Sequence, residues 1–203
     1  MYKIKSLPEF SQWLESLDDK LLKGAILGRL RRIELGLKGD VKTVGDRVYE
    51  LRIHLGAGWR VYFTERNGDL IVLLCGGNKR TQTKDIKRAK DLSSAIKQRV
   101  EPMRTEKLEL NEIENFSISE HLDSPETIAA YLTDILESND PALLAAALGD
   151  IARAKGMSDV AKCTGITREA LYKALRNNAS PRFETVAKVC SAFGVKLVAQ
   201  AMH

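Results

Sequence analysis

Residues 156–175, GMSDVAKCTGITREALYKAL, predict two short helices joined by a tight turn, the layout of a DNA-binding helix-turn-helix. Ser158 is a helix N-cap type, and Gly165 supplies the backbone freedom that a tight turn needs. Thr167 is placed to cap the second helix. Apolar residues of that second helix fall on one inward stripe, made of Ala170, Leu171, Ala174 and Leu175.

The opposite face of the second helix carries side chains that can reach base edges and phosphates in a major groove. The residues that we expect to bind nucleic acid, as base readers, phosphate contacts or the cap, are Ser158, Thr167, Arg168, Glu169, Tyr172, Lys173 and Arg176. An ordinary helical hairpin with a charged solvent face is the alternative that the spacing leaves open.

The charge of the chain is divided unequally between its halves. The 203 residues carry a net charge of +5, from 32 Lys and Arg against 27 Asp and Glu. Residues 1–100 hold 21 basic and 12 acidic side chains, a net of +9, and residues 101–203 hold 11 and 15, a net of −4. Opposite signs favour either nucleic acid as a partner of the basic half or neutralisation of one half by the other.

The three cysteines, Cys75, Cys163 and Cys190, are scattered and form no paired motif. We therefore expect neither a disulfide framework nor a zinc site, and no metal or other cofactor. The first residues lack the apolar core of a signal peptide, and no apolar run approaches the length of a membrane span. These features predict a cytoplasmic protein without a membrane partner.

The first half alternates between helical and extended patterns. A short strand is expected at residues 2–5, and apolar spacing then predicts two consecutive helices, a helical hairpin, ending at Gly36. Period-two alternation predicts strands around residues 49–53, 59–63 and 70–74, joined as a meander through the Asn67-Gly68 turn. A basic helix is expected over residues 81–98.

Polar residues of the meander share one face of the predicted sheet. Any antiparallel register that keeps apolar residues opposite each other places Glu50, Arg52, His54, Arg60 and Tyr62 together. If helices cover only the apolar face, this set is open to a ligand, with Lys79 just after the third strand. Cations beside a possible acid and base suit cleavage of an RNA phosphodiester without a metal. Solvated strand residues near a turn are the alternative.

The segment from Val100 to Asn115 predicts a boundary, because Pro102 breaks any helix and the composition turns acidic. Ser124-Pro125, Asp140-Pro141 and Ser180-Pro181 each predict the start of a further helix. We expect a basic domain at 1–100, an acidic linker at 101–124 that masks the basic surface, and a helical domain at 125–203.

Longer runs of the sequence resemble known families. VYELRIHLGAGWRVYF (48–63) and IVLLCGGNKRTQTKDIKRAK (71–90) resemble the RelE/ParE-superfamily addiction module killer toxins. ETIAAYLTDILESNDPALLAAALGDIARAKGMSDVAKCTGITREALYKAL (126–175) and PRFETVAKVCSAFGVKL (181–197) resemble addiction module antidote proteins with a Cro/C1-type helix-turn-helix. The resemblance implies an α+β fold: a helical hairpin on a small antiparallel sheet, followed by an all-α domain.

The resemblance also implies an activity for each half. RelE-like toxins cleave mRNA on the ribosome, whereas ParE-like toxins poison DNA gyrase. Matched by position on the sheet, Arg52, Arg60 and Lys79 take the cationic positions of the nuclease branch, with Tyr62 and His54 as acid or base. No Tyr or His follows Tyr62 in the first half, so the acid–base residue that many nuclease members carry near the toxin C-terminus is absent.

The second half is then expected to neutralise the first, within one chain or between chains, and to bind the operator DNA of its own operon as a repressor. A helix-turn-helix usually meets two half-sites, so we expect a homodimer. A plain DNA-binding repressor with an inactive toxin-like module is a further alternative.

Overall fold

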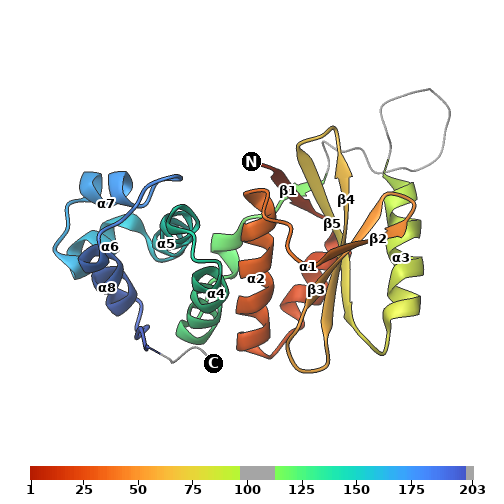
Figure 1. The fold of residues 1–203 in the computed structure, drawn as a ribbon, viewed down its shortest axis with the longest axis horizontal. Coiled ribbons are helices and arrows are strands. Elements are labelled where there is room, and N and C mark those ends of the chain that lie inside the picture. The colour runs from red at the N-terminus through yellow and green to blue at the C-terminus, as the bar shows by residue number, and fades with distance from the viewer. Residues whose placement is uncertain (97–112, 200–203) are drawn as a thin grey trace. The chain divides into compact units, whose positions relative to one another are not determined.

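A computed structural model of the chain describes residues 1–96 and 113–199 (Figure 1). The chain forms two compact units, and neither is continuous in sequence. The first unit contains Met1–Asp18 and Ile33–Phe116, and the second contains Asp19–Arg32 and Ser117–His203. A stretch from the first half of the sequence therefore belongs to the second unit.

The first unit is built on a six-stranded sheet in the order β2-β3-β4-β5-β1-β6. Its strands are β1 (Lys3–Ser6), β2 (Val41–Gly45), β3 (Val48–Ile53), β4 (Trp59–Arg66), β5 (Leu70–Asn78) and β6 (Glu114–Asn115). The predicted meander is present as β3, β4 and β5, paired antiparallel. However, β1 pairs with β5 in parallel, so the sheet is mixed rather than wholly antiparallel.

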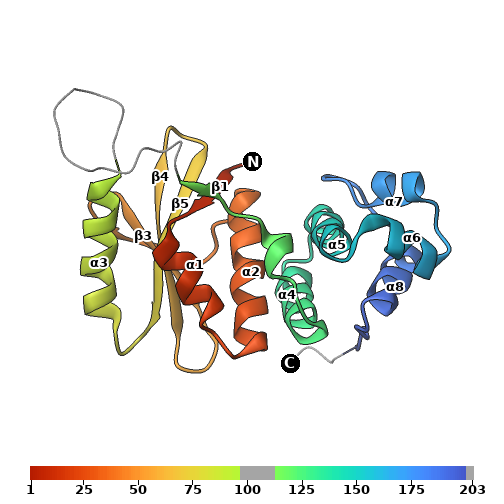
Figure 2. The same cartoon turned by 180° about the vertical axis from the view of Figure 1, so that it is seen from behind.

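Two helices cover opposite faces of this sheet, α1 (Pro8–Glu15) and α3 (Gln82–Ala95), as Figures 1 and 2 show. Phe10 and Leu14 of α1 are fully buried. Trp13 lies so close to Gly76 of β5 that a Cβ at position 76 would overlap the indole ring, which explains glycine there. On the other face, Ala89 of α3 joins the buried cluster that contains Tyr62.

The cover by α3 corrects one expectation from the sequence. The polar residues of the meander were expected to lie open beside an apolar face covered by helices. Instead, α3 packs over the face that carries Tyr62, and both Tyr62 and Glu50 are fully buried. Ala89 of α3 is buried in the cluster with Tyr62, and Ile86 and Leu92 pack against that cluster, so the helix expected at 81–98 covers the polar face of the meander.

The second unit is helical. Its elements are the Asp19–Arg32 part of α2 (Lys20–Glu34), a 3-10 turn η1 (Ile118–His121), α4 (Pro125–Glu137), α5 (Pro141–Lys155), α6 (Met157–Thr164), α7 (Arg168–Ala174) and α8 (Phe183–Ala192). Ser124 and Asp140 cap α4 and α5, with proline at the first helical position, as their dipeptides predicted. The prediction for Ser180-Pro181 was wrong, because α8 begins at Phe183 and its N-cap position is Arg182.

Two elements thus belong to a unit that is built mostly from the other half of the sequence. Most of α2, the second helix of the predicted hairpin, groups with α4 and α5. In return, β6 pairs antiparallel with β1 at the edge of the sheet, and Ile113, just before it, is buried in the core of the first unit. Among the described residues, no helix combines the length and apolar character that crossing a bilayer requires.

Candidate functional site

The predicted cations of the sheet converge on one buried carboxylate. Glu50 of β3 is directly opposite Tyr62 of β4, and Arg52 is directly opposite Arg60. Arg52 donates from Nε to Glu50 Oε1 at 2.8 Å, and Arg60 Nε lies 3.5 Å from Oε2. The face that the alternation predicted, in the register that the structure shows, therefore brings both guanidinium groups onto the same acid.

Two neutral donors complete the surroundings of Glu50. Tyr62 donates from Oη to Oε2 at 3.2 Å, and Gln82, in the first turn of α3, donates from Nε2 to the same oxygen at 2.7 Å. Burial by itself would raise the pKa of Glu50, but the hydrogen bonds from Arg52, Gln82 and Tyr62 and the charge of Arg60 hold that pKa below its ordinary value. Glu50 is thus an ionised anchor for two arginines.

Lys79 joins this group through the loop between β3 and β4. The carbonyl oxygen of Gly58 accepts from Arg60 Nη1 at 2.7 Å and from the backbone N–H of Lys79 at 3.0 Å. Gly58 has a φ of +71°, a conformation that glycine adopts without strain. The side chain of Arg52 is 32% exposed, that of Arg60 is 11% exposed, and Lys79 is exposed. We call Arg52, Arg60 and Lys79, with Glu50 beneath them, the cationic cluster.

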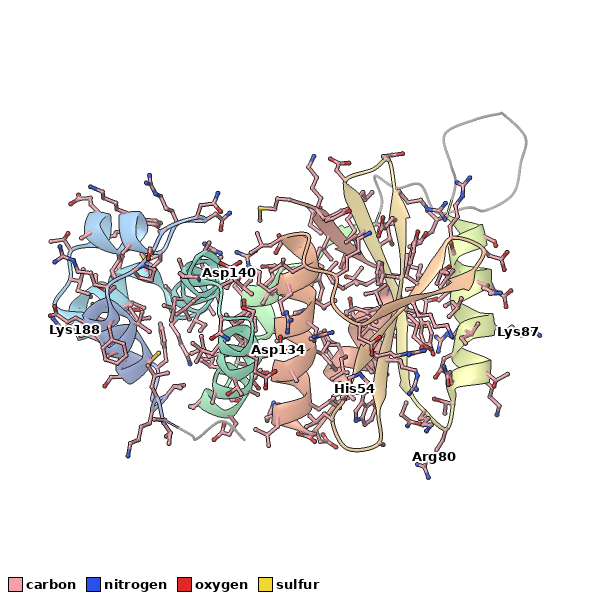
Figure 3. The ribbon with its side chains drawn as sticks, viewed as in Figure 1. His54, Arg80, Lys87, Asp134, Asp140 and Lys188 are labelled. Carbon is pink, nitrogen blue, oxygen red and sulfur yellow. The ribbon has the colours of Figure 1, made fainter. Side chains whose placement is uncertain are left out.

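The two predicted acid–base residues lie in unlike environments. Burial, and then the negative charge of Glu50, raise the pKa of Tyr62 far above its usual range, so its hydroxyl keeps its proton. His54 follows the end of β3 with its side chain 77% exposed, and its Nε2 lies 2.7 Å from Asp40 Oδ2. Figure 3 shows His54 and Arg80 at the same end of the sheet. Asp40 also lies 3.9 Å from Arg52, so His54 is tied to the rim of the cluster.

The predicted nucleic-acid-binding residues lie on α6 and α7. Gly165 joins the two helices in the left-handed conformation, and the hydroxyl of Thr167 accepts from the backbone N–H of Ala170, which caps α7. Ser158 does not cap α6, because that helix begins one residue earlier and its N-cap position is Gly156. Ser158 is instead an exposed residue of the first turn.

The outward face of α7 is polar and exposed. Leu171 and Leu175 are buried beneath it, whereas Ala170 of the predicted inward stripe is exposed. Exposed side chains on or beside the helix are Thr167, Arg168, Glu169, Tyr172, Lys173 and Arg176. The guanidinium of Arg168 lies over the ring of Tyr172, 5.5 Å from its centroid, which is a cation–π contact on this exposed face.

The expected acidic linker at 101–124 is described only in its last part, since residues 101–112, with the Pro102 boundary, lie outside the described residues. Asp123, near its end, pairs with Lys20 and Lys23 of α2, at 3.6 and 2.9 Å. Over the described residues, no cluster of three or more His, Cys, Asp or Glu is arranged to hold a metal ion.

Comparisons with known proteins divide the chain in two. Residues 12–100 match the family "Phage derived protein Gp49-like (DUF891)", and residues 112–201 match the family "Probable addiction module antidote protein". An uncharacterized protein of Haemophilus influenzae is 46% identical over 94 residues, which cover 46% of this chain and 95% of that protein.

The chain belongs to these two families, one in each half. A second uncharacterized protein of the same strain is 45% identical over 89 residues, covering 44% of this chain and 92% of that protein. No solved structure matches the chain significantly. The toxin-type Gp49-like half and the antidote half of a toxin–antitoxin system are therefore joined in one chain.

The family boundaries give the exchanged elements a meaning. The helix α2 lies within the Gp49-like match but groups with the antidote half, and Ile113 and β6 lie within the antidote match but belong to the Gp49-like sheet. Lys5 Nζ donates to the carbonyl oxygen of Ile113 at 2.8 Å, which fixes the start of the antidote half beside β1.

Several residues that organise these sites were not singled out from the sequence. Gln82 had no distinguishing signal, since a glutamine in a basic helix is ordinary. Gly24 and Gly28 carried one, because glycines four residues apart inside a helical pattern often mark a close helix contact. Asp150 is a lone acid in an otherwise apolar stretch of α5, which also favours a buried partner.

Proposed function

We propose that this toxin–antitoxin chain has a Gp49-like half that acts as a metal-independent, ribosome-dependent endoribonuclease on mRNA, which the antidote half neutralises. The observation that carries this is the cationic cluster, where Arg52 and Arg60 share the buried Glu50 and Lys79 lies beside Arg60. Guanidinium groups held at a fixed spacing suit binding of a phosphodiester and stabilisation of the charge that builds on it.

In this proposal Glu50 orients the arginines and is not the general base. Its lowered pKa makes Glu50 a weak proton acceptor. Its oxygens already accept hydrogen bonds from Arg52, Tyr62 and Gln82, and they face the charge of Arg60. Catalysis then rests on charge stabilisation by Arg52, Arg60 and Lys79. His54, at the rim of the cluster, is the candidate for the acid or base.

The test expresses residues 1–100 and residues 103–203 from separate inducible promoters. We expect residues 1–100 to arrest growth with fragmented mRNA, and residues 103–203 to restore growth. Arg60→Ala should abolish the arrest, whereas Arg88→Ala, an exposed arginine of α3, should keep it. Growth without arrest when residues 1–100 are expressed in a soluble, folded form, as circular dichroism would show, would contradict the proposal. Arrest with intact mRNA and stalled supercoiling would instead favour gyrase inhibition.

A second proposed function concerns the antidote half, and it is supported by the exposed face of α7. We propose that α7 enters the major groove of the operator of its own operon, with Arg168, Glu169, Tyr172 and Lys173 as readers. A homodimer of the chain would place two such helices on two half-sites.

A mobility-shift titration of the full chain tests this proposal. We expect Lys173→Ala to lose specificity for the operator, and Lys188→Ala of α8 is the control. Wild-type binding by the α7 variant would contradict this proposal, and specific binding by a chain without toxicity would favour a plain repressor.

A further inference from the structure

One face of α2 carries cations and glycines at helical spacing. Lys20, Lys23, Gly24, Gly28 and Arg31 fall at i, i+3, i+4, i+8 and i+11, which places them on one side of the helix. Asp19 caps the helix by accepting from the backbone N–H groups of its first turn. In the second unit, this face of α2 is directed at α4 and α5 of the antidote half.

The two glycines set the distance between α2 and α4. A Cβ at Gly24 would overlap the backbone carbonyl oxygen of Thr127 and lie 2.6 Å from the Cβ of Ala130. A Cβ at Gly28 would lie 2.8 Å from the Cβ of Asp134, which Figure 3 shows between the two helices. A backbone atom cannot turn aside as a side chain can, so any larger residue at position 24 forces the helices apart.

Charge pairs follow the same direction along both helices. Lys23 donates to Asp123 just before α4, and Arg32 lies 3.6 Å from Asp134, about two and a half to three turns further along. Residue numbers increase along both helices from one contact to the next, so α2 and α4 run in the same direction. The pairing therefore has a fixed register, with positive charge on one helix and negative charge on the other.

A buried carboxylate ends this contact. Asp150 of α5 lies 3.0 Å from Arg31 Nε, and the side chains of Arg31 and Asp150 are only 4% and 6% exposed. Tyr131 of α4 donates to the same Asp150 at 2.7 Å, and Arg153 pairs with its other oxygen. The antidote half thus contacts α2 through close packing, through charge pairs and through the buried carboxylate of Asp150.

We propose that α2 is the handle through which the antidote half restrains the Gp49-like half. The surface of α4 and α5 is a docking site for one cationic helix with glycines four residues apart, and toxicity is withheld while the α2 of the chain is seated there. This inference rests on the proposed toxicity of the Gp49-like half. It differs from an anionic cover over Arg52 and Arg60, because α2 carries neither residue.

The test uses the full chain with two single substitutions, one from glycine to alanine and one from alanine to glycine. Gly24→Ala raises helix propensity but adds a Cβ against Thr127, whereas Ala25→Gly lowers helix propensity next to the contact. If propensity alone mattered, Gly24→Ala would tighten the helix. We expect the reverse: faster amide hydrogen exchange in residues 20–34 and 125–137, and growth arrest on expression, for Gly24→Ala and not for Ala25→Gly.

A milder variant protects the test against a failure to fold. Lys23→Glu opposes Asp123 with a second acid and should give the same changes to a smaller degree, while Lys42→Glu on the exposed face of β2 should give neither. Wild-type exchange in both Gly24→Ala and Lys23→Glu would overturn the docking site. Faster exchange without growth arrest would overturn the handle.

The double variant Gly24→Ala with Arg60→Ala separates this inference from the proposed nuclease. Loss of arrest in the double variant supports both. Arrest that persists supports the handle, because release of α2 still unleashes toxicity, and it overturns only the role of the cationic cluster.

Discussion

Arg31 of α2 and Asp150 of α5 form a buried ion pair, with Nε 3.0 Å from Oδ2. One partner comes from the Gp49-like family match and the other from the antidote match. A buried pair is costly to break, since the remaining charge stays in a dry environment without its partner. This contact therefore links the two sequence families energetically.

Loss of Arg31 should destabilise the chain strongly. Arg31→Met leaves Asp150 buried without its partner from α2, and we expect the free energy of unfolding in urea to fall by about 3 kcal/mol. Arg153→Met removes a 54% exposed partner of the same carboxylate and should cost less than about 1 kcal/mol. Equal losses from the two variants would show that the α2 contact has no special weight.

The start of the antidote half should stabilise the Gp49-like sheet. Ile113 is 4% exposed in the core of the first unit. Ile113→Ala should lower the free energy of unfolding by about 2–4 kcal/mol, because it leaves a cavity in that core. Leu37→Ala, at a side chain that is 42% exposed, should change it by less than about 0.5 kcal/mol. An unchanged unfolding curve for Ile113→Ala would mean that the antidote half does not reach this core.

The contribution of Glu50 should depend on pH. Its pKa in the folded chain lies below the ordinary 4.5, so the charged form stabilises the fold above pH 4.5. That stabilisation is lost as the pH falls through the folded pKa. We therefore expect Glu50→Gln to be less stable than the wild type at neutral pH, with the difference shrinking in acid. Urea titrations across this range measure it, and Glu120→Gln, at an exposed position, is the control. A difference that is independent of pH would contradict the assignment.

The hydroxyl of Tyr62 should matter for stability and not for catalysis. Tyr62→Phe removes its bond to Glu50, so we expect a loss of about 1 kcal/mol in the free energy of unfolding. RNA cleavage by residues 1–100 with Tyr62→Phe should keep its wild-type rate, because the buried hydroxyl does not release its proton. Arg60→Ala, in the same assay, should lower the rate by about 10²-fold or more. A comparable loss of cleavage in Tyr62→Phe would restore the acid–base role first assigned to it.

Alternation in the sequence predicted the central strands and which of their residues share a face. Period-two spacing predicted that Glu50, Arg52, Arg60 and Tyr62 share one face of the sheet, and the structure adds which of them pair, Glu50 with Tyr62 and Arg52 with Arg60. The helices around Gly165 and the proline-started α4 and α5 also follow from local signals, because caps and turns depend on a few neighbouring residues. What these signals specify is local structure.

Long-range packing accounts for what was missed. Whether α3 covers the face of Tyr62 depends on the tertiary fold and not on the spacing within either element. In the same way, apolar spacing predicted the helix α2 but not which partner it would meet. Arg31 and Asp150 are far apart in sequence, and although the apolar stretch around Asp150 favours a buried partner, only the fold shows that this partner is Arg31.

The central claim is that α2 of the Gp49-like half is seated on α4 of the antidote half. The most direct measurement is a nuclear Overhauser spectrum of the full chain with isotope-labelled alanine methyl groups. A cross-peak between the Ala130 methyl group and the Hα protons of Gly24 is the predicted result, since a Cβ at position 24 would lie 2.6 Å from that of Ala130. A well-resolved Ala130 methyl signal without that cross-peak would contradict the account.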